Sequence, residues 1–229
     1  MTIWDEYPAD YRQAEIEMIL SAVRAGECVS LAGLSGAGKS NLMGFLAHRC
    51  QGLGGLVFAL VDGNRVRPPT AAGLFNLTRQ SLGGPAQAAD EFLALEEAVG
   101  LALGGAKTGL CLLFDRFDAL SESERAAAAG PLRALRDAYK YRLTFVIAAR
   151  RPIDPCSELA ELFYAHTIWL GPLSRENALW SAAQYGARRG LNWDAAVLER
   201  LVSISWGYPA LLRACCEACA GGASLELGV

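Results

Sequence analysis

The sequence predicts an α/β fold in which helices cover a parallel sheet, followed by a region that is helical only. Short apolar runs, each long enough for one strand, alternate with segments of helical periodicity up to about residue 173. The runs at 110–115 and 143–149 are apolar at nearly every position. Continuous runs of this kind are typical of strands buried on both faces of a parallel sheet. From residue 174 onward only helical patterns occur.

Each element follows from its local pattern. Strands are predicted at 28–32, 56–61, 110–115, 143–149 and 166–170. Helices are predicted at 8–24, 41–52, 71–82, 86–103, 131–141, 174–189, 192–205 (starting at Asn192 or Asp194) and 210–220. Glycine and proline clusters separate most of them. We therefore predict a doubly wound domain over residues 1–173 and a small helical subdomain, or lid, over 174–229.

The first strand run leads into Gly33-Leu34-Ser35-Gly36-Ala37-Gly38-Lys39-Ser40, which fits the pattern G-x-x-x-x-G-K-[ST] at every fixed position. This segment, residues 33–40, is called the phosphate loop below. Strand, glycine loop and helix follow one another here, and that order counts against a chance match. Backbone N–H groups of such a loop hold phosphate oxygens, helped by the positive end of the next helix. The predicted nucleotide-binding residues are Gly33, Ser35, Gly36, Ala37, Gly38, Lys39, Ser40 and Asn41.

A candidate metal-binding carboxylate lies at the end of the run 110–115. Asp115 closes that run, so we predict that its carboxylate and the Ser40 hydroxyl ligate Mg²⁺. The alternative for Asp115 is a turn or helix cap. Arg116 occupies the next position, where P-loop enzymes that hydrolyse the nucleotide usually carry an acidic residue. An arginine cannot accept a proton at neutral pH. The sequence therefore supports nucleotide binding better than fast hydrolysis.

Further candidates surround this pair. Asp118 follows two residues after Arg116, and Arg150 ends the strand run 143–149. Strand C-termini of a parallel sheet share one edge, so Arg150 is predicted to sense the γ-phosphate. Its alternative is a salt bridge with a surface acid. The predicted catalytic residues are Lys39, Asp115, Asp118 and Arg150.

Composition narrows the classes of partner. The formal charge of −3 and the absence of like-charge runs argue against a general grip on nucleic acid. The sequence has no apolar run long enough for a membrane span and no signal peptide pattern, so the cytoplasm is the expected location. Only Cys215, Cys216 and Cys219 cluster among seven cysteines, and buried thiols explain them better than a metal site.

Taken together, these motifs resemble the AAA+-like STAND ATPases (signal-transduction ATPases with numerous domains) and their origin-recognition-type relatives. The resemblance rests on Tyr11–Ile16, similar to an Arg-x-x-Glu-hydrophobic signature, and on the phosphate loop as Walker A. It also rests on Leu112–Asp118 as Walker B, on Arg150 as the sensor arginine, and on Gly207-Tyr208-Pro209 as the G-x-P motif of the lid.

The resemblance implies a P-loop NTPase sandwich with strand order 5-1-4-3-2 and a helical lid. It implies ATP or ADP with Mg²⁺ as ligands, and adds Arg12 and Pro209 to the predicted nucleotide site. It also implies a nucleotide-dependent switch, and the arginine at position 116 adds the expectation that ATP hydrolysis is slow. The expected partners are another protein or further copies of this chain. The mild net charge argues against nucleic acid as a partner of this domain, and the lack of a long apolar run argues against a membrane. Arg116 departs from the family pattern.

Two other functions remain open. A DNA-associated ATPase or loader of the origin-recognition type would need a basic face, and Arg133, Arg136, Lys140 and Arg142 form only a modest basic stretch. A small-molecule kinase would need an acceptor-binding insert, and the helical end fits a lid better.

Overall fold

The computed structural model describes residues 2–105, 109–163 and 165–223. The chain divides into two compact units. The sheet unit holds residues 14–33, 39–169 and the N-terminal residues up to Glu6. The helical unit holds residues 7–13, 34–38 and the chain from Leu170 onward. The predicted boundary at residue 174 stays a prediction.

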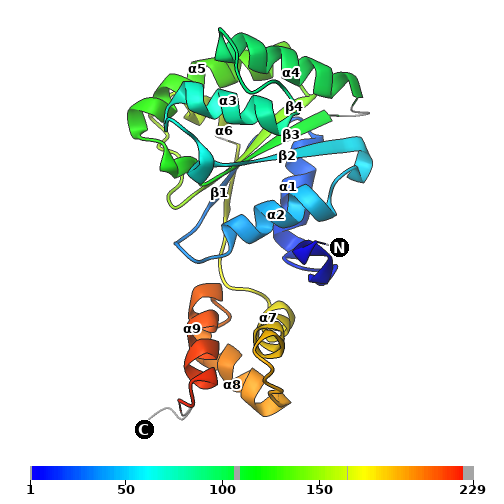
Figure 1. Cartoon of the computed structure of the whole chain (residues 1–229), viewed down its shortest axis with the longest axis vertical. Coiled ribbons are helices and arrows are strands. Elements are labelled where there is room, and N and C mark those ends of the chain that lie inside the picture. The colour runs from blue at the N-terminus through cyan, green and yellow to red at the C-terminus, as the bar shows by residue number, and fades with distance from the viewer. Residues whose placement is uncertain (1, 106–108, 164, 224–229) are drawn as a thin grey trace. The chain divides into compact units, whose positions relative to one another are not determined.

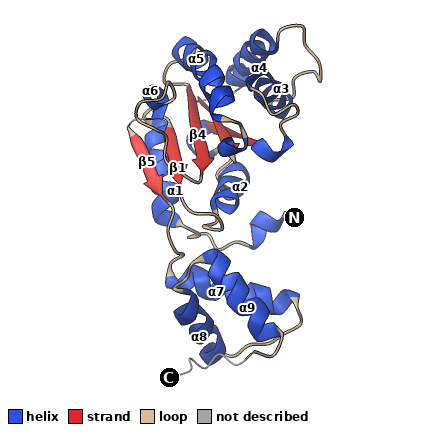
Figure 2. Ribbon diagram, turned by 90° about the vertical axis from the view of Figure 1, so that its left-hand side faces the viewer, coloured by secondary structure: helices blue, strands red, loops and turns tan. Residues whose placement is uncertain are grey.

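The sheet unit contains five parallel strands in the order β2-β3-β4-β1-β5. The strands are β1 (Val29–Ala32), β2 (Leu56–Asp62), β3 (Gly109–Asp115), β4 (Leu143–Ala149) and β5 (His166–Trp169). Read from the other edge, this order is 5-1-4-3-2, so the predicted sheet is confirmed. Every residue of β3 and β4 is buried, as the continuous apolar runs predict. Figure 2 shows β1, β4 and β5 running in the same direction.

Helices cover both faces of the sheet. The helices are α1 (Gln13–Arg24), α2 (Lys39–Arg49), α3 (Ala71–Ser81), α4 (Glu91–Gly105), α5 (Glu122–Ala138) and α6 (Ala160–Phe163). Short 3-10 turns are η1 (Ile3–Glu6), η2 (Leu53–Gly55), η3 (Gly63–Arg65) and η4 (Phe117–Ala119). Figure 1 shows α3, α4 and α5 on one face and α2 on the other. A core of buried apolar side chains lies under α3, α4 and α5 and contains Leu112, Phe114 and Phe145.

The helical unit consists of α7 (Arg175–Arg188), α8 (Ala195–Ser205) and α9 (Pro209–Ala220), together with residues 7–13 and 34–38. Ser174 and Asp194 cap α7 and α8 by accepting hydrogen bonds from backbone N–H groups. Tyr7 packs against the rings of Tyr11 and Trp180 at centroid distances of 4.8 and 4.7 Å. This aromatic contact holds the N-terminal segment on α7.

Several predicted helix bounds were wrong. The helix predicted from residue 8 begins at Gln13, because Arg12 has a left-handed backbone (φ 47°) that interrupts the helical geometry. The helix predicted at 86–103 begins at Glu91, where the Asp90 carboxylate accepts from two backbone N–H groups. The helix predicted from Pro131 begins at Glu122, because an alanine-rich stretch capped by Ser121 precedes the proline.

The helix α6 was not predicted, because four residues carry too little periodicity. In the described residues, no helix is both long and apolar enough to cross a membrane.

Candidate functional site

The phosphate loop turns tightly between β1 and α2. Gly36 and Gly38 have φ values of 78° and 92°, a region that side chains with a Cβ rarely adopt. The Ala37 N–H donates to the Leu34 carbonyl at 3.2 Å and closes the turn. Helix α2 begins immediately afterwards at Lys39. A glycine turn followed directly by the positive end of a helix is the arrangement that binds anions.

Lys39 lies among carboxylates of the sheet unit. Its ammonium donates to the Gly33 carbonyl at 2.6 Å. Burial lowers the pKa of Lys39, while the charges of Asp118 and Asp115 oppose that shift. The two carboxylates therefore lie within electrostatic reach of this ammonium, and the predicted set Lys39, Asp115 and Asp118 gathers in one region.

Asp115 is the last residue of β3, and it is buried. Burial raises the pKa of the Asp115 carboxyl, and hydrogen bonds from the Ser40 hydroxyl and the Arg116 N–H counter the increase. In the described residues, no group of three or more His, Cys, Asp or Glu side chains could hold a metal. A hydroxyl beside one carboxylate nevertheless fits Mg²⁺, which prefers oxygen ligands and takes the others from phosphates and water.

Asp118 and Arg150 form an ion pair. The Arg150 Nε donates to the Asp118 carboxylate at 2.5 Å, and the Arg150 backbone N–H reaches the same oxygen at 3.3 Å. Burial acts to raise the pKa of Asp118, but the hydrogen bonds from Arg150 outweigh it, so the pKa is lowered. The salt bridge left open by the sequence analysis is thus present in the structure. The Asp118 carboxylate is therefore engaged by Arg150. The sensing role of Arg150 stays a prediction.

The end of β2 contributes a carboxylate that the sequence analysis passed over. Asp62 pairs with Asp115 in the parallel register of β2 and β3. Its charge acts to raise the pKa of Asp115. The available signal was its position, because carboxyl ends of parallel strands share one edge.

Arg12 holds part of the phosphate loop within the helical unit. Its guanidinium donates to the Ala37 carbonyl at 2.8 Å and to the Gly171 carbonyl at 2.9 Å. Its backbone N–H donates to Asn177 Oδ1 at 2.8 Å. Only 4% of Arg12 is exposed. The structure therefore shows Arg12 bound to the backbone around the loop, and its predicted contact with nucleotide stays a prediction.

The start of α9 lies against the same loop residues. The Tyr208 hydroxyl donates to the Ser35 carbonyl at 3.1 Å. A Cβ at Gly38 would lie 3.7 Å from Pro209 Cγ, and a Cβ at Gly36 would lie 2.4 Å from the Cβ of Ala210. Pro209 is thus close to the loop, and its predicted contact with nucleotide stays a prediction. The contacts of Tyr208 and Ala210 were not predicted, because nothing local in the sequence indicates them.

The positions of the remaining predicted site residues complete the description. Ser40 and Asn41 lie in the first turn of α2, and both are exposed. In the sheet unit the structure gathers Lys39, Ser40, Asp115, Asp118 and Arg150. In the helical unit it gathers Ser35, Gly36, Ala37, Gly38, Arg12 and Pro209.

Comparison with known proteins identifies the fold. No family model matches the sequence, and no curated protein matches it. Solved structures do resemble it. A Walker-type ATPase of Pyrococcus abyssi has a TM-score of 0.63 and 13% identity over 92% of this chain and 68% of that one. Cdc6p of Pyrobaculum aerophilum has a TM-score of 0.60 and 13% identity over 93% of this chain and 62% of that one.

The ORC1 protein of Aeropyrum pernix, in complex with DNA, has a TM-score of 0.61 and 16% identity. That match covers 95% of this chain and 62% of ORC1, so this chain spans less than two thirds of both Cdc6p and ORC1. The fold of this chain is therefore the α/β fold of P-loop ATPases, as predicted.

Proposed function

We propose that the chain binds ATP or ADP with Mg²⁺ through the phosphate loop and acts as a nucleotide-dependent switch that hydrolyses ATP slowly. The observation that carries this proposal is the grouping of Lys39, Ser40 and Asp115 at the start of α2 and the end of β3. An ammonium beside a hydroxyl–carboxylate pair suits a triphosphate and its metal. Mg²⁺, when bound, would neutralise charge on the phosphate oxygens.

Slow hydrolysis follows from the carboxylates near Lys39. Arg116, in the position after Asp115, cannot accept a hydrogen bond from water through its guanidinium. Asp118 already accepts two hydrogen bonds from Arg150. The usual means of activating water next to Asp115 are therefore weak, and we expect turnover well below the range of dedicated ATPases.

The switch part of the proposal draws on the contacts of the loop. Arg12 and Tyr208 donate to the carbonyls of Ala37 and Ser35, so loop residues and the start of α9 are linked within the helical unit. Phosphate binding that moves the loop backbone would act directly on these bonds. We propose that the helical unit responds in this way, and that a protein partner or a second copy of the chain receives the response.

Nucleotide binding is tested with a fluorescent ADP analogue. Lys39→Ala is expected to weaken binding at least about 100-fold, the effect of removing a half-buried, charged phosphate contact. Lys140→Ala, which removes an exposed lysine over the Tyr141 ring, serves as the control and should bind as the wild type does. Unchanged affinity in Lys39→Ala would contradict the assignment of the loop. Size-exclusion chromatography with ADP and with ATP then tests assembly.

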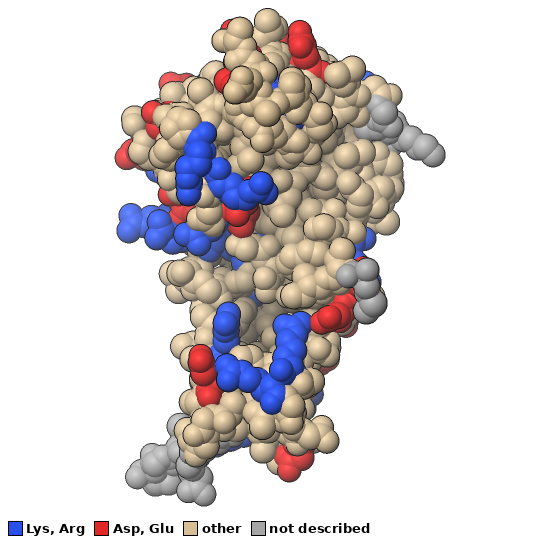
Figure 3. All heavy atoms as spheres, viewed as in Figure 1, with Lys and Arg blue, Asp and Glu red and all other residues tan. Residues whose placement is uncertain are grey.

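A DNA-associated ATPase is the second candidate function. Two structural neighbours, Cdc6p and ORC1, favour it over a signalling switch, and ORC1 is bound to DNA in its structure. The charge of this chain opposes it, because the net charge is −3 and the pI is about 5.5. On the face in Figure 3, Lys and Arg side chains occur in separate groups with acidic side chains nearby.

Adding duplex DNA distinguishes the two candidate functions. Under the DNA-associated function, fluorescence anisotropy detects binding that weakens steeply with salt, and DNA raises the ATP turnover rate. Under the switch function, DNA changes neither signal at 150 mM salt, roughly the physiological ionic strength.

A further inference from the structure

Two carboxylates end neighbouring strands of the sheet. Asp62 is the last residue of β2 and Asp115 the last residue of β3, and the two are partners in the parallel register. Neighbouring strands lie about 4.8 Å apart, and residues in register point to the same face. The side chains of Asp62 and Asp115 therefore lie next to each other at the carboxyl edge of the sheet.

The face that carries this pair is the one that faces α2. Val61 and Phe114, one residue earlier on each strand, belong to the core under α3, α4 and α5. Because side chains alternate along a strand, Asp62 and Asp115 point to the opposite face. Helix α2 packs on that face against β2 and β3, and it begins with Lys39. Asp62 thus projects to the side of the sheet that holds the phosphate-binding lysine.

The position of Asp62 is held by its backbone surroundings. One carboxylate oxygen accepts from the Asn64 N–H at 2.9 Å. A Cβ at Gly63 would lie 2.4 Å from the Arg116 carbonyl oxygen, so the ends of β2 and β3 are in close backbone contact. Asp62 is half-buried and reaches water. Its second oxygen can therefore accept a hydrogen bond from a water molecule at this edge.

The two carboxylates that act on Lys39, those of Asp115 and Asp118, are less suited to that role. Asp115 is buried beside the Ser40 hydroxyl, as a metal ligand would be. Asp118 is engaged by Arg150. In the part of the chain that the structure describes, no Lys or Arg side chain pairs with Asp62.

We propose that Asp62 supplies, from the neighbouring strand, the carboxylate that positions the attacking water in ATP hydrolysis. The inference rests on the proposed function. The water oxygen forms a bond to the γ-phosphorus while the bond from that phosphorus to the bridging oxygen breaks. The bridging oxygen and its electron pair leave with ADP, and the proton lost by the water passes to the released phosphate or to solvent. Asp62 accepts the hydrogen bond that aims the water and remains unchanged.

The alternative is that Asp62 only caps the turn η3, since its side chain accepts from Asn64. Asp62→Asn separates the two roles, because an asparagine oxygen still caps the turn but lacks the negative charge. Asp90→Asn is the matched control. Asp90 accepts from backbone N–H groups at the start of α4 in the same way, and it lies outside the nucleotide site. Asp62→Ser, a second residue able to cap, replaces Asp62→Asn if the latter does not fold.

The experiment measures kcat for ATP, affinity for a fluorescent ADP analogue and the melting temperature. We expect Asp62→Asn to lower kcat at least about tenfold, with affinity and melting temperature close to the wild type. Asp90→Asn should leave all three unchanged. A kcat for Asp62→Asn within twofold of the wild type would overturn the proposal.

Two outcomes distinguish a failure of this inference from a failure of the proposed function. Wild-type protein that binds nucleotide without any turnover overturns this inference and leaves nucleotide binding in place. Wild-type protein that binds no nucleotide overturns both.

Discussion

Replacing Arg12 by alanine is expected to destabilise the helical unit strongly. The guanidinium makes two short hydrogen bonds to the carbonyls of Ala37 and Gly171, at 2.8 and 2.9 Å, in a side chain that is almost fully buried. A hydrogen bond from a charged donor contributes about 1.5–3 kcal/mol. Because neighbouring bonds do not add fully, we expect a total loss of about 3–5 kcal/mol.

The substitution isolates the side chain. Arg12 has a φ of 47°, and alanine carries much the same backbone penalty there as arginine does. For a chain of 150–250 residues, each kcal/mol shifts the melting temperature by about 2–4 °C. Arg12→Ala should therefore lower it by roughly 6–20 °C. Thermal unfolding followed by circular dichroism measures the shift.

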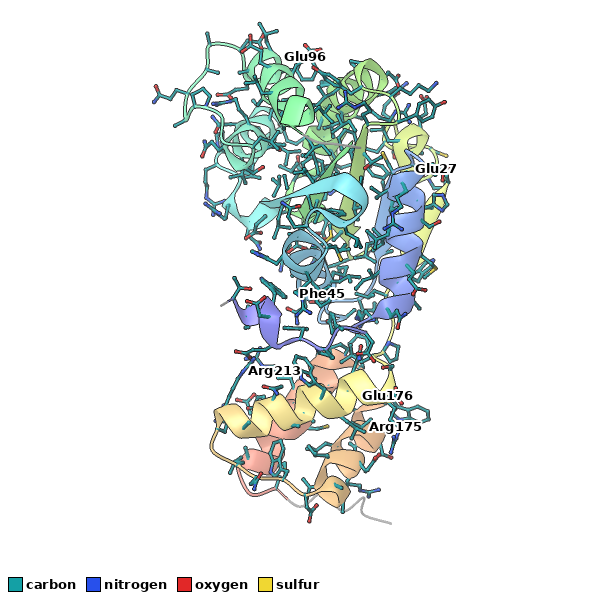
Figure 4. All side chains as sticks on the ribbon, turned by 90° about the vertical axis from the view of Figure 1, so that its right-hand side faces the viewer. Glu27, Phe45, Glu96, Arg175, Glu176 and Arg213 are labelled. Carbon is teal, nitrogen blue, oxygen red and sulfur yellow. The ribbon has the colours of Figure 1, made fainter. Side chains whose placement is uncertain are left out.

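Arg175 provides the control within the same unit. It pairs with Glu199, and the two side chains are 62% and 43% exposed. Figure 4 labels Arg175 near the start of α7. An exposed pair of this kind contributes about 0–1 kcal/mol. A loss for Arg12→Ala no larger than the loss for Arg175→Ala would refute the reasoning, because it would mean that the buried hydrogen bonds stabilise nothing.

Three further outcomes are expected. Burial raises the pKa of Asp115 above its unfolded value, so its ionisation removes stability as pH rises through the folded pKa. Asp115→Asn should accordingly raise the melting temperature at pH 7, with the gain shrinking toward pH 4, and a lower melting temperature at pH 7 would contradict this. Gly36→Ala should lower the melting temperature more than Gly38→Ala. The positive φ costs each alanine about 1–2 kcal/mol of stability, but only the Cβ added at Gly36 also meets an atom 2.4 Å away. Equal losses would count against the contact. Iodoacetamide at pH 8 should label exposed Cys156 and spare Cys111, whose pKa burial raises to about 12, as mass spectrometry of the folded protein can establish. Labelling of Cys111 at a comparable rate would indicate that the sheet opens readily.

Local patterns were sufficient for most of the fold and for part of the site. The phosphate loop is a continuous segment whose glycines, lysine and serine stand at set spacings, so it could be found without knowing the fold. The apolar runs of β3 and β4 showed that these strands are buried on both faces. The run that ends in Asp115 also predicted a carboxylate at the edge of the sheet.

Other features depend on which strands become neighbours. Arg150 pairs with Asp118, 32 residues earlier in the sequence, because β4 lies beside β3. The sequence alone left that arginine open between a sensor and a salt bridge. Likewise, Asp62 directly follows the strand predicted at 56–61, and only the register of β2 with β3 brings it next to Asp115.

By itself, therefore, the sequence determined the phosphate loop, the five strands, the helical end and the carboxylate of Asp115. Each of these features depends on the periodicity or spacing of residues within one contiguous segment. Only the tertiary structure decided what Arg12, Asp62 and Arg150 contact. The partners of Arg12 lie 25 to 165 residues away, that of Arg150 lies 32 residues away, and that of Asp62 lies on a neighbouring strand. Contacts of this kind depend on strand order, strand register and burial, which no local pattern of residues specifies.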